Sequence, residues 1–194
     1  MAPPSSQKQW VIQGKTRGFD ELVYQDAPVP TLGEYDVLVK LGGASLNYRD
    51  LIIPQGKYPF PLNLPVVGAS DGAGEVVDAG PKVTRWRAGD RVTTLFNQGH
   101  QAGPMTIAAS KSGLGGVLDG TLRQYGVFHE TGLVRTPRDL SDVEAATLTC
   151  AALTSWNALY GLKPLLPGQT VLVQGTGGVS LFALQVSEVS AALR

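Results

Sequence analysis

Three glycines near the end of the chain have the spacing of a phosphate-binding turn. Gly175, Gly177 and Gly178 follow the short apolar run 171–173, and a helix is predicted to begin at about Val179. Glycines allow a sharp turn and a close approach of the backbone, and the unpaired amides at a helix N-terminus favour an anion. The pattern predicts a strand, a turn and a helix that hold a pyrophosphate. An ordinary glycine-rich connection is the alternative.

This glycine pattern is incomplete in two respects. Ser180 stands where the third glycine of a dinucleotide-binding fingerprint belongs. In such folds the residue that contacts the ribose follows the glycines by about 20 positions, which lies beyond Arg194, and further strand and helix units follow. We therefore expect either a fragment of a longer protein or a natural truncation that has lost most of a cofactor domain.

A compact polar cluster lies between two apolar stretches in the first half of the chain. Asn47, Arg49 and Asp50 follow one another closely, and Tyr58 comes soon after them. Amide, carboxyl and phenol groups between buried strands are typical of a binding or catalytic site. The structural alternative is a helical turn that Asn47 caps and Asp50 supports. The residues alone leave both interpretations open.

Metal and disulfide chemistry have few candidate residues. The single cysteine, Cys150, excludes an internal disulfide framework and is typical of a reducing compartment. The two histidines, His100 and His129, do not have the spacing of metal ligands. We expect both histidines on the surface.

The composition limits the class of protein. The chain has 194 residues, 43% hydrophobic content and a formal net charge of +0. This length suits one complete domain and part of another. Because no basic cluster is present, nucleic acid and anionic membranes are not expected partners. The start of the chain lacks the apolar core of a signal peptide, and no run reaches the roughly 20 apolar residues that span a bilayer, so we expect a soluble, cytoplasmic protein.

Short apolar runs separated by glycine and proline predict an irregular β-rich body over residues 1–140. The expected strands are 10–12 and 22–24, paired as a hairpin, and then 36–41, 75–78, 91–94, 124–128 and 133–134. Val37, Val39 and Leu41 are expected on one face of their strand. Trp86 is expected at the edge of the core, and a glycine-rich loop over 97–120.

The composition changes sharply at Ser141. Ser141 and Glu144 form a capping box that begins a helix. The alanine-rich stretch 143–162 predicts one or two helices, which end at Gly161. We therefore expect a β-rich domain over 1–140, and linking helices with the beginning of a nucleotide-binding α/β domain over 141–194.

Several strings of residues occur in a recognisable order. They are N-Y-R-D-L-I-I-P-Q-G-K-Y-P (47–59), G-A-S-D-G-A-G-E-V-V-D-A-G (68–80), A-G-D-R-V (88–92), C-A-A-L-T-S-W-N-A-L (150–159) and V-L-V-Q-G-T-G-G-V-S (171–180). Together they resemble the medium-chain dehydrogenase/reductase superfamily nearly end to end, and most closely its quinone oxidoreductase branch and fungal zinc-type alcohol dehydrogenase-like proteins. The resemblance implies an α/β protein in which a GroES-like catalytic domain precedes a Rossmann domain with a doubly wound parallel sheet, here truncated.

The resemblance also bears on zinc. The zinc enzymes of this superfamily have a cysteine at the position of Asn47 and a His-Glu pair at Ser70 and Asp71, so only the third ligand position, Cys150, keeps a thiol. Catalytic zinc takes three protein ligands and an open position. We therefore expect no catalytic zinc and expect Cys150 to be a small core residue. The region 94–125 has no cysteine, so the structural zinc loop is not expected either.

The resemblance implies roles for individual residues. Asn47 and Asp50 are expected at the nicotinamide end of the cleft, and Tyr58 beside the acceptor, where it donates a hydrogen bond to the acceptor oxygen. Thr154 is expected to contact the nicotinamide or its ribose. The residues expected at the pyrophosphate are Gly175, Gly177, Gly178 and Val179. NADPH is the expected cofactor, with NADH as the alternative.

These expectations point to hydride transfer, as in an enoyl reductase. Without zinc, an unactivated ketone lacks its Lewis acid, whereas a quinone or an α,β-unsaturated carbonyl spreads the incoming charge onto an oxygen. We expect an NAD(P)H-dependent quinone or enone oxidoreductase that acts on a small molecule and is inactive as this shortened chain. The alternatives are a non-catalytic GroES-like binding or assembly module, including a homodimer, and a zinc-type alcohol dehydrogenase.

Overall fold

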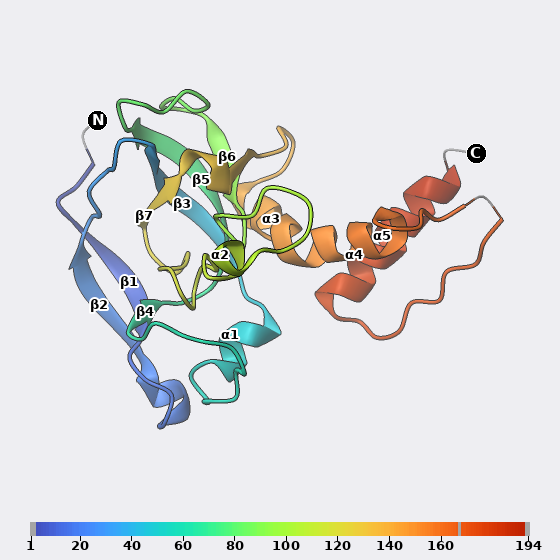
Figure 1. Ribbon diagram of the computed structural model, residues 1–194, viewed down its shortest axis with the longest axis horizontal. Helices are drawn as coiled ribbons and strands as arrows, with labels where there is room; N and C mark the ends of the chain where they lie inside the picture. The colour runs from blue at the N-terminus through green and yellow to red at the C-terminus, as the bar shows by residue number, and fades with distance from the viewer. Residues whose placement is uncertain (1–2, 167, 193–194) are drawn as a thin grey trace. The chain divides into compact units, whose positions relative to one another are not determined.

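The computed structural model describes residues 3–166 and 168–192. The chain divides into two units, Met1–Ala146 and Thr147–Arg194. In the described part of the chain, all strands belong to the first unit and the two longest helices to the second (Figure 1). The candidate residues of the polar cluster therefore lie in the first unit, and those of the glycine turn in the second.

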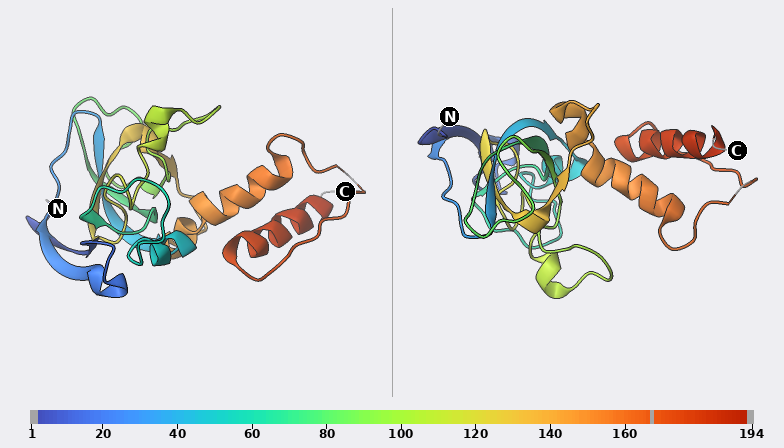
Figure 2. Two further views of the ribbon diagram at one scale, coloured as in Figure 1. Left: turned by 60° about the horizontal axis from the view of Figure 1, so that its bottom comes forward. Right: turned by 90° about the horizontal axis from the view of Figure 1, so that it is seen from above.

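Two antiparallel sheets form the first unit (Figure 2). One sheet has the strand order β2-β1-β4 and the other the order β7-β3-β5-β6-β8. Their strands are β1 (Ser6–Ile12), β2 (Leu22–Pro28), β3 (Asp36–Ser45), β4 (Val66–Val67), β5 (Asp71–Ala79), β6 (Arg91–Thr94), β7 (Tyr125–His129) and β8 (Leu133–Arg135). The connections contain α1 (Tyr48–Ile52), α2 (Ile107–Ser110), the short 3₁₀ turns η1 (Gly18–Glu21) and η2 (Glu130–Gly132), and α3 (Asp142–Ala146). The predicted β-rich body is confirmed.

The predicted strands form where apolar residues alternate. In the β1–β2 hairpin, Trp10 pairs with Tyr24. Val37 and Val39 on β3 are 0% exposed, and Leu41 packs against the same cluster. Trp86 lies deeper than its expected place at the core edge, because its indole nitrogen donates a 2.7 Å hydrogen bond to the Glu130 carbonyl. The stretch expected as a loop over 97–120 contains the short helix α2.

Close backbone packing explains two glycine positions in the large sheet. A Cβ on Gly74 of β5 would overlap the Lys40 carbonyl oxygen of β3. A Cβ on Gly43 of β3 would lie 2.7 Å from the Asp142 carbonyl oxygen, so α3 packs directly on the strand. At the start of α3 the Ser141 backbone N–H donates to Glu144 Oε2 at 2.8 Å, which confirms the predicted capping box.

The second unit is helical in its described residues. A π-helical turn (Leu148–Ala152) leads into α4 (Leu153–Tyr160), which ends at the predicted Gly161, and α5 (Gly178–Ala192) packs against both. The strand predicted at 171–173 is wrong: these residues have no strand partner, and Leu172 is 83% exposed. A buried parallel strand requires neighbouring strands on both sides. The described residues of this unit supply none, so the parallel Rossmann sheet implied by the resemblance is not formed.

No helix among the described residues has the length and apolar character to cross a membrane. This agrees with the absence of a long apolar run in the sequence.

A buried carboxylate fixes the loop that follows β1. Glu21 is 3% exposed, and its Oε1 accepts hydrogen bonds from the backbone N–H groups of Thr16 at 3.3 Å and Arg17 at 3.2 Å. Its Oε2 pairs with Arg17 Nη2 at 3.1 Å. The Arg17 hydrogen bond is the main reason that the pKa of Glu21 falls from 4.5 to about 2.

Replacing Glu21 should reduce the fall in the free energy of unfolding that accompanies a shift from neutral to acid pH. We expect Glu21→Gln to lower the free energy of unfolding at neutral pH, and the difference from wild type to shrink as the pH falls from 4.5 to about 2. The ionised carboxylate is favoured in the folded protein, so its contribution is present above the unfolded pKa and disappears as the folded pKa is passed. Urea denaturation at a series of pH values measures this. A difference that stays constant over the whole range would contradict it.

Candidate functional site

Asn47 and Asp71 are neighbours because their strands pair. β3 and β5 run antiparallel with Ser45 opposite Asp71, which places the end of β3 next to the start of β5. Asn47 Nδ2 donates a 3.0 Å hydrogen bond to Asp71 Oδ2. The Ser70 hydroxyl donates a 2.6 Å hydrogen bond to the other oxygen, Oδ1, and Asp71 is 1% exposed. Both oxygens of this buried carboxylate are therefore engaged by side chains.

The short helix α1 positions the rest of the polar cluster. It begins with a capping box of Asn47 and Asp50, in which Asp50 Oδ2 accepts a 2.8 Å hydrogen bond from the Asn47 backbone N–H. The structural alternative for these two residues is thus confirmed. It does not account for the Asn47 amide nitrogen, which binds Asp71. Asn47 is consequently held from two sides, by α1 and by β5.

Burial changes the protonation of the two carboxyl groups. Desolvation raises the pKa of Asp71, against the hydrogen bonds from Ser70 and Asn47 that favour the ionised form. Desolvation likewise raises the pKa of Asp50, and the Asn47 backbone N–H partly offsets it. Perturbed carboxyl groups of this kind are common at functional sites. Both groups keep a proton to a higher pH than an exposed aspartic acid.

Arg49 links this cluster to Tyr58. The guanidinium carbon lies 5.1 Å from the centre of the Tyr58 ring and 4.8 Å from the centre of the Phe96 ring. Nη1 lies 4.0 Å from Asp50 Oδ1. Tyr58 therefore shares Arg49 as a neighbour with the Asn47, Asp50 and Asp71 cluster. The structure brings all three predicted catalytic residues into one region of the first unit.

The glycine turn in the second unit has the local geometry of an anion cradle. Gly175 has a φ of +86°, and α5 begins at Gly178 as predicted to within one residue. The Ser180 hydroxyl donates to the Gln174 carbonyl at 2.7 Å and closes the turn, which gives a role to the residue that replaces the third glycine. The free amides at the start of a helix favour a phosphate.

The space around Gly177 bears on whether a ligand can approach the turn. A Cβ at this position would meet no atom within 4 Å, so the neighbouring residues do not require glycine here. A dinucleotide-binding turn uses such a glycine to let the backbone approach the pyrophosphate. Open space beside Gly177 is compatible with a ligand at the turn, but the parallel sheet that completes a dinucleotide site is not formed by the described residues.

The remaining predicted residues lie as follows. Thr154 is exposed near the start of α4, and Val179 is 43% exposed on the first turn of α5. Cys150 is half-buried in the π-helical turn, not fully buried as a core residue. His129 is exposed as expected, whereas His100 is half-buried with Nε2 3.0 Å from the Gly103 carbonyl oxygen.

Reasoning from the sequence gave no role to Arg49, Phe96 or Ser155. The Ser155 hydroxyl donates to the Val179 carbonyl at 2.6 Å and fixes the start of α5 to α4. Arg49 was named in the predicted polar cluster with Asn47 and Asp50, but without a role of its own. Contacts between rings and a guanidinium that lie far apart in sequence leave no periodic pattern, so only the structure shows them.

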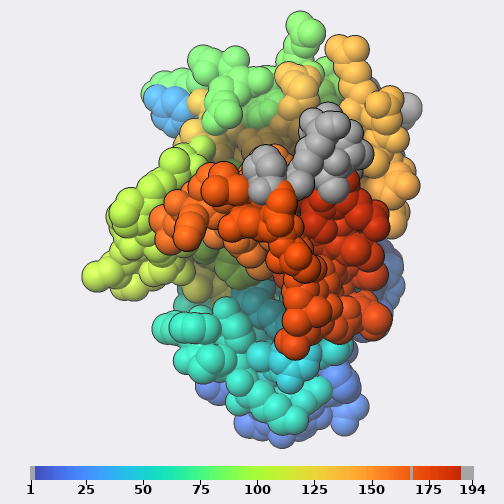
Figure 3. Space-filling model, turned by 90° about the vertical axis from the view of Figure 1, so that its right-hand side faces the viewer, coloured from blue at the N-terminus to red at the C-terminus, as the bar shows by residue number. Residues whose placement is uncertain are grey.

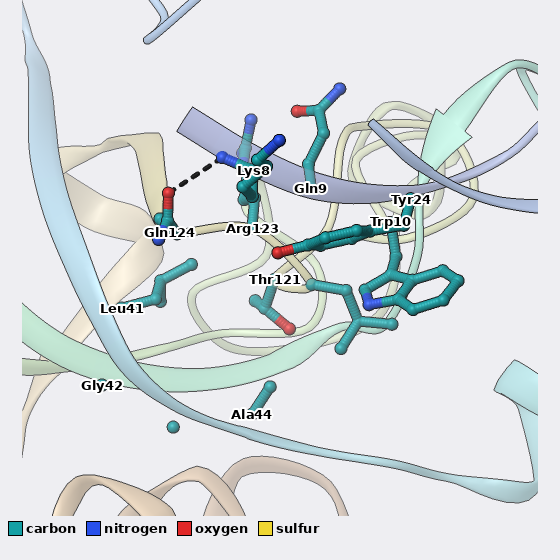
Figure 4. Close-up of a pocket in the computed structure, with 12 residues that line it drawn as sticks. Lys8, Gln9, Trp10, Tyr24, Leu41, Gly42, Ala44, Thr121, Arg123 and Gln124 are labelled. Carbon is teal, nitrogen blue, oxygen red and sulfur yellow. Dashed lines mark hydrogen bonds between the residues drawn. The ribbon is translucent and has the colours of Figure 1, made fainter. Parts of the chain in front are cut away.

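A separate cavity of about 270 Å³ contains none of the predicted residues. It lies between the β1–β2 hairpin, the middle of β3 and the segment 121–124, and Figure 4 shows Trp10 and Tyr24 side by side on its wall. The Lys8 backbone N–H donates to Gln124 Oε1 at 2.8 Å across it. This hydrogen bond joins the two segments and does not bring reactive groups together.

A match to a protein-family model shows the family to which the chain belongs. Residues 33–138 match the alcohol dehydrogenase GroES-like domain. The chain belongs to this family. The GroES-like match spans β3 to β8 and includes the whole cluster around Asn47 and Asp71.

Two curated relatives extend the match beyond the GroES-like domain. The chain is 48% identical over 180 residues to a zinc-type alcohol dehydrogenase-like protein of Schizosaccharomyces pombe, covering 91% of this chain and 52% of the relative. It is 34% identical over 196 residues to the acryloyl-coenzyme A reductase of Metallosphaera sedula, covering 95% of this chain and 56% of that protein. The chain thus spans about half the length of these relatives.

Solved structures confirm the fold. A crystal structure provisionally named an alcohol dehydrogenase, from Sinorhizobium meliloti, matches with a TM-score of 0.87 and 39% identity, over 97% of this chain and 55% of that one. The quinone oxidoreductase of Pseudomonas syringae matches with a TM-score of 0.74 and 28% identity, over 94% of this chain and 50% of that one. The GroES-like family therefore includes oxidoreductases with different named activities.

The residues of this GroES-like domain do not fit a catalytic zinc. Among residues 3–166 and 168–192, no group of three or more His, Cys, Asp or Glu side chains gathers as metal ligands. At the two positions where the resemblance implies a cysteine and a histidine, this chain has the Asn47 amide and the Ser70 hydroxyl, and both donate to Asp71. Zinc prefers thiolate, imidazole and carboxylate ligands. The Schizosaccharomyces pombe relative is nevertheless named zinc-type, so the comparison does not support the expectation of a zinc-free protein.

Proposed function

We propose that this GroES-like chain contributes the catalytic half of an oxidoreductase that transfers hydride from NADPH to a quinone or an α,β-unsaturated carbonyl without catalytic zinc. NADH is the alternative cofactor. The observation that carries the proposal is the hydrogen-bonded set of Asn47, Ser70 and Asp71. The resemblance places this set where the zinc enzymes have a cysteine and a His-Glu pair. A small-molecule acceptor is the proposed partner, and a cytoplasmic location stays a prediction.

The chemistry of the acceptor explains why a metal is dispensable. The bound cofactor supplies the hydride. A conjugated acceptor moves the incoming charge to its oxygen, so a neutral donor at that oxygen stabilises the transition state without a metal ion. The names of two similar proteins agree with such acceptors: one is an acryloyl-coenzyme A reductase and the other a quinone oxidoreductase.

Residues of the first unit would have different roles in binding the acceptor and the cofactor. Tyr58 offers a phenolic hydroxyl to the acceptor oxygen. Asp71 and Asp50 hold Asn47 in one orientation, through its side chain at 3.0 Å and its backbone at 2.8 Å. A fixed amide can position the nicotinamide end of the cofactor with little loss of side-chain entropy. In this proposal Asn47 and Tyr58 touch the reactants, and the two aspartates position Asn47.

The second unit would seat the phosphates. The amides at Gly175, Gly177, Gly178 and Val179 are the proposed pyrophosphate contacts, with Thr154 at the nicotinamide or its ribose. Because no parallel sheet supports this turn in the described residues, we expect the 194-residue chain to bind a dinucleotide poorly. NADPH fluorescence titration tests this expectation. Binding in the sub-micromolar range would show that the chain is competent by itself.

The reaction itself is tested by completing the cofactor domain. A fusion of the 194-residue chain to the second half of the Schizosaccharomyces pombe relative adds the part of that relative that this chain does not cover. We expect NADPH oxidation with 1,4-naphthoquinone or an enone, unchanged by a zinc chelator, and loss of the reaction in Asn47→Ala. Oxidation of ethanol that stops when the chelator is added would instead support a zinc-type alcohol dehydrogenase.

A non-catalytic assembly module is a second candidate, and the surface of the second unit favours it. Large apolar side chains are exposed there: Leu153, Trp156, Leu162, Leu166, Leu172, Val179, Leu181 and Leu184. Figure 3 shows the segment that joins α4 to α5, in orange, on the surface. Large exposed apolar side chains are typical of interaction sites, and for this candidate the partner would be a second copy of the chain. A monodisperse dimer in size-exclusion chromatography and cross-linking, without cofactor binding, would favour this candidate.

A further inference from the structure

A cavity of about 310 Å³ in the first unit is lined by cationic and aromatic side chains. Its lining residues are Arg49, Tyr58, Phe60, Pro61, Phe96, Asn97, Ser110, Lys111, Gly113 and Val117. Two of these side chains are cations, Arg49 and Lys111, and none is acidic. The volume is at the lower end of the range of small-molecule pockets. The cavity therefore suits a small, flat ligand that carries negative charge.

Arg49 is held rigidly at the wall of this cavity. Its guanidinium carbon lies 5.1 Å from the centre of the Tyr58 ring and 4.8 Å from the centre of the Phe96 ring, and its side chain is 13% exposed. The third nitrogen, Nη2, occupies the place where a Cβ on Gly116 would lie. A guanidinium held beside two rings loses little side-chain freedom when it binds a ligand oxygen.

The hydrogen-bonding capacity of Arg49 is not used within the described part of the protein. Its Nε and Nη1 have no hydrogen-bond partner, but protein atoms enclose both of them, so they do not open into the cavity. Nη2 makes no hydrogen bond within the described residues and is not among these enclosed atoms, so it is the guanidinium nitrogen that a ligand in the cavity can reach. The carboxylate nearest to the guanidinium, Asp50, is 4.0 Å away, which is too long for a hydrogen bond, and Asp50 Oδ1 also lacks one. The Asp71 carboxylate is engaged by Ser70 and Asn47. Buried donors without partners are rare in folded proteins and need an explanation.

We propose that Arg49 determines substrate specificity by binding an anionic oxygen, such as a carboxylate, on a planar acceptor whose ring packs against Tyr58 and Phe96. This inference rests on the proposed function, because it names the class of quinone or enone that the same site accepts. Lys111 adds a second, exposed positive charge to the lining. A neutral acceptor would offer no anionic oxygen to the accessible Nη2 of Arg49 and would bind less tightly.

Binding of a charged and a neutral probe to the 194-residue chain tests the proposal without cofactor. The probes are 2-naphthoate and its neutral counterpart 2-naphthamide, measured by isothermal titration calorimetry. We expect wild type to bind 2-naphthoate about tenfold more tightly than 2-naphthamide, because only the carboxylate accepts a charge-assisted hydrogen bond from Arg49. Arg49→Met should remove this preference, and Arg85→Met should keep it, because Arg85 contacts Trp86 and does not line the cavity.

A second variant covers the case in which Arg49→Met does not fold. Gly116→Ala keeps the charge but displaces Nη2, which is the flexible end of a side chain. We expect the same loss of preference in this variant. Equal affinity of wild type for the two probes, or a preference that survives in both variants, would overturn the proposal. Reduction of neutral 1,4-naphthoquinone by the completed fusion tests the proposed function separately, so the failure of one does not imply the failure of the other.

Discussion

Gly74→Val is expected to prevent stable folding of the first unit. The lost stability should be roughly 4 kcal/mol or more, because the added side chain would overlap the Lys40 carbonyl of the paired strand. β3 and β5 form the centre of the five-stranded sheet, so the strands cannot separate without loss of the neighbouring pairs. Circular dichroism and urea denaturation of the purified variant measure the effect.

A glycine without close neighbours provides the control for this variant. Gly177→Ala adds a Cβ that meets no atom within 4 Å, and we expect it to change stability by less than about 0.5 kcal/mol. Unfolding of Gly74→Val at the same urea concentration as wild type would show that β3 and β5 do not approach as closely as described.

Asp71→Ala should destabilise the first unit by roughly 2 kcal/mol. The variant leaves the Ser70 hydroxyl and the Asn47 amide nitrogen without their acceptor, and an unsatisfied buried donor costs about 1 to 3 kcal/mol. Removing a carboxyl whose pKa is raised by burial recovers part of this loss. Thermal and urea denaturation measure the net change.

The neighbouring strand residues allow a matched comparison for Asp71. Asp71→Asn keeps one oxygen acceptor and should lose less stability than Asp71→Ala. Asp78→Ala removes an exposed carboxylate from the same strand and should change stability by less than about 0.5 kcal/mol. If Asp71→Ala and Asp78→Ala had equal stability, Asp71 would have no part in holding Asn47.

The sequence predicted the β-rich unit well because its signals are local. The alternation in 36–41, the strand at 91–94 and the capping box at Ser141 each depend on a few adjacent residues. The strand at 171–173 was predicted wrongly for the opposite reason. Its apolar run is typical of a buried parallel strand, but such a strand depends on partners that the described residues do not provide.

The candidate site was predicted in its residue types and not in its contacts. Asn47 and Asp50 were singled out from spacing, and their capping interaction is local. The bond from Asn47 to Asp71 spans 24 residues and requires the pairing of β3 with β5. The position of Arg49 beside Tyr58 and Phe96 depends on two separate loops. Long-range contacts of this kind follow from the fold as a whole.

The central claim, that Asn47, Ser70 and Asp71 form a hydrogen-bonded set in place of a zinc site, is tested most directly by zinc content. The 194-residue chain is purified with zinc in the medium, dialysed, and analysed for bound metal. We expect no more than about one-tenth of a zinc ion per chain, because an amide and a hydroxyl are poor zinc ligands. A value of about one zinc ion per chain that Asn47→Ala abolishes would contradict it.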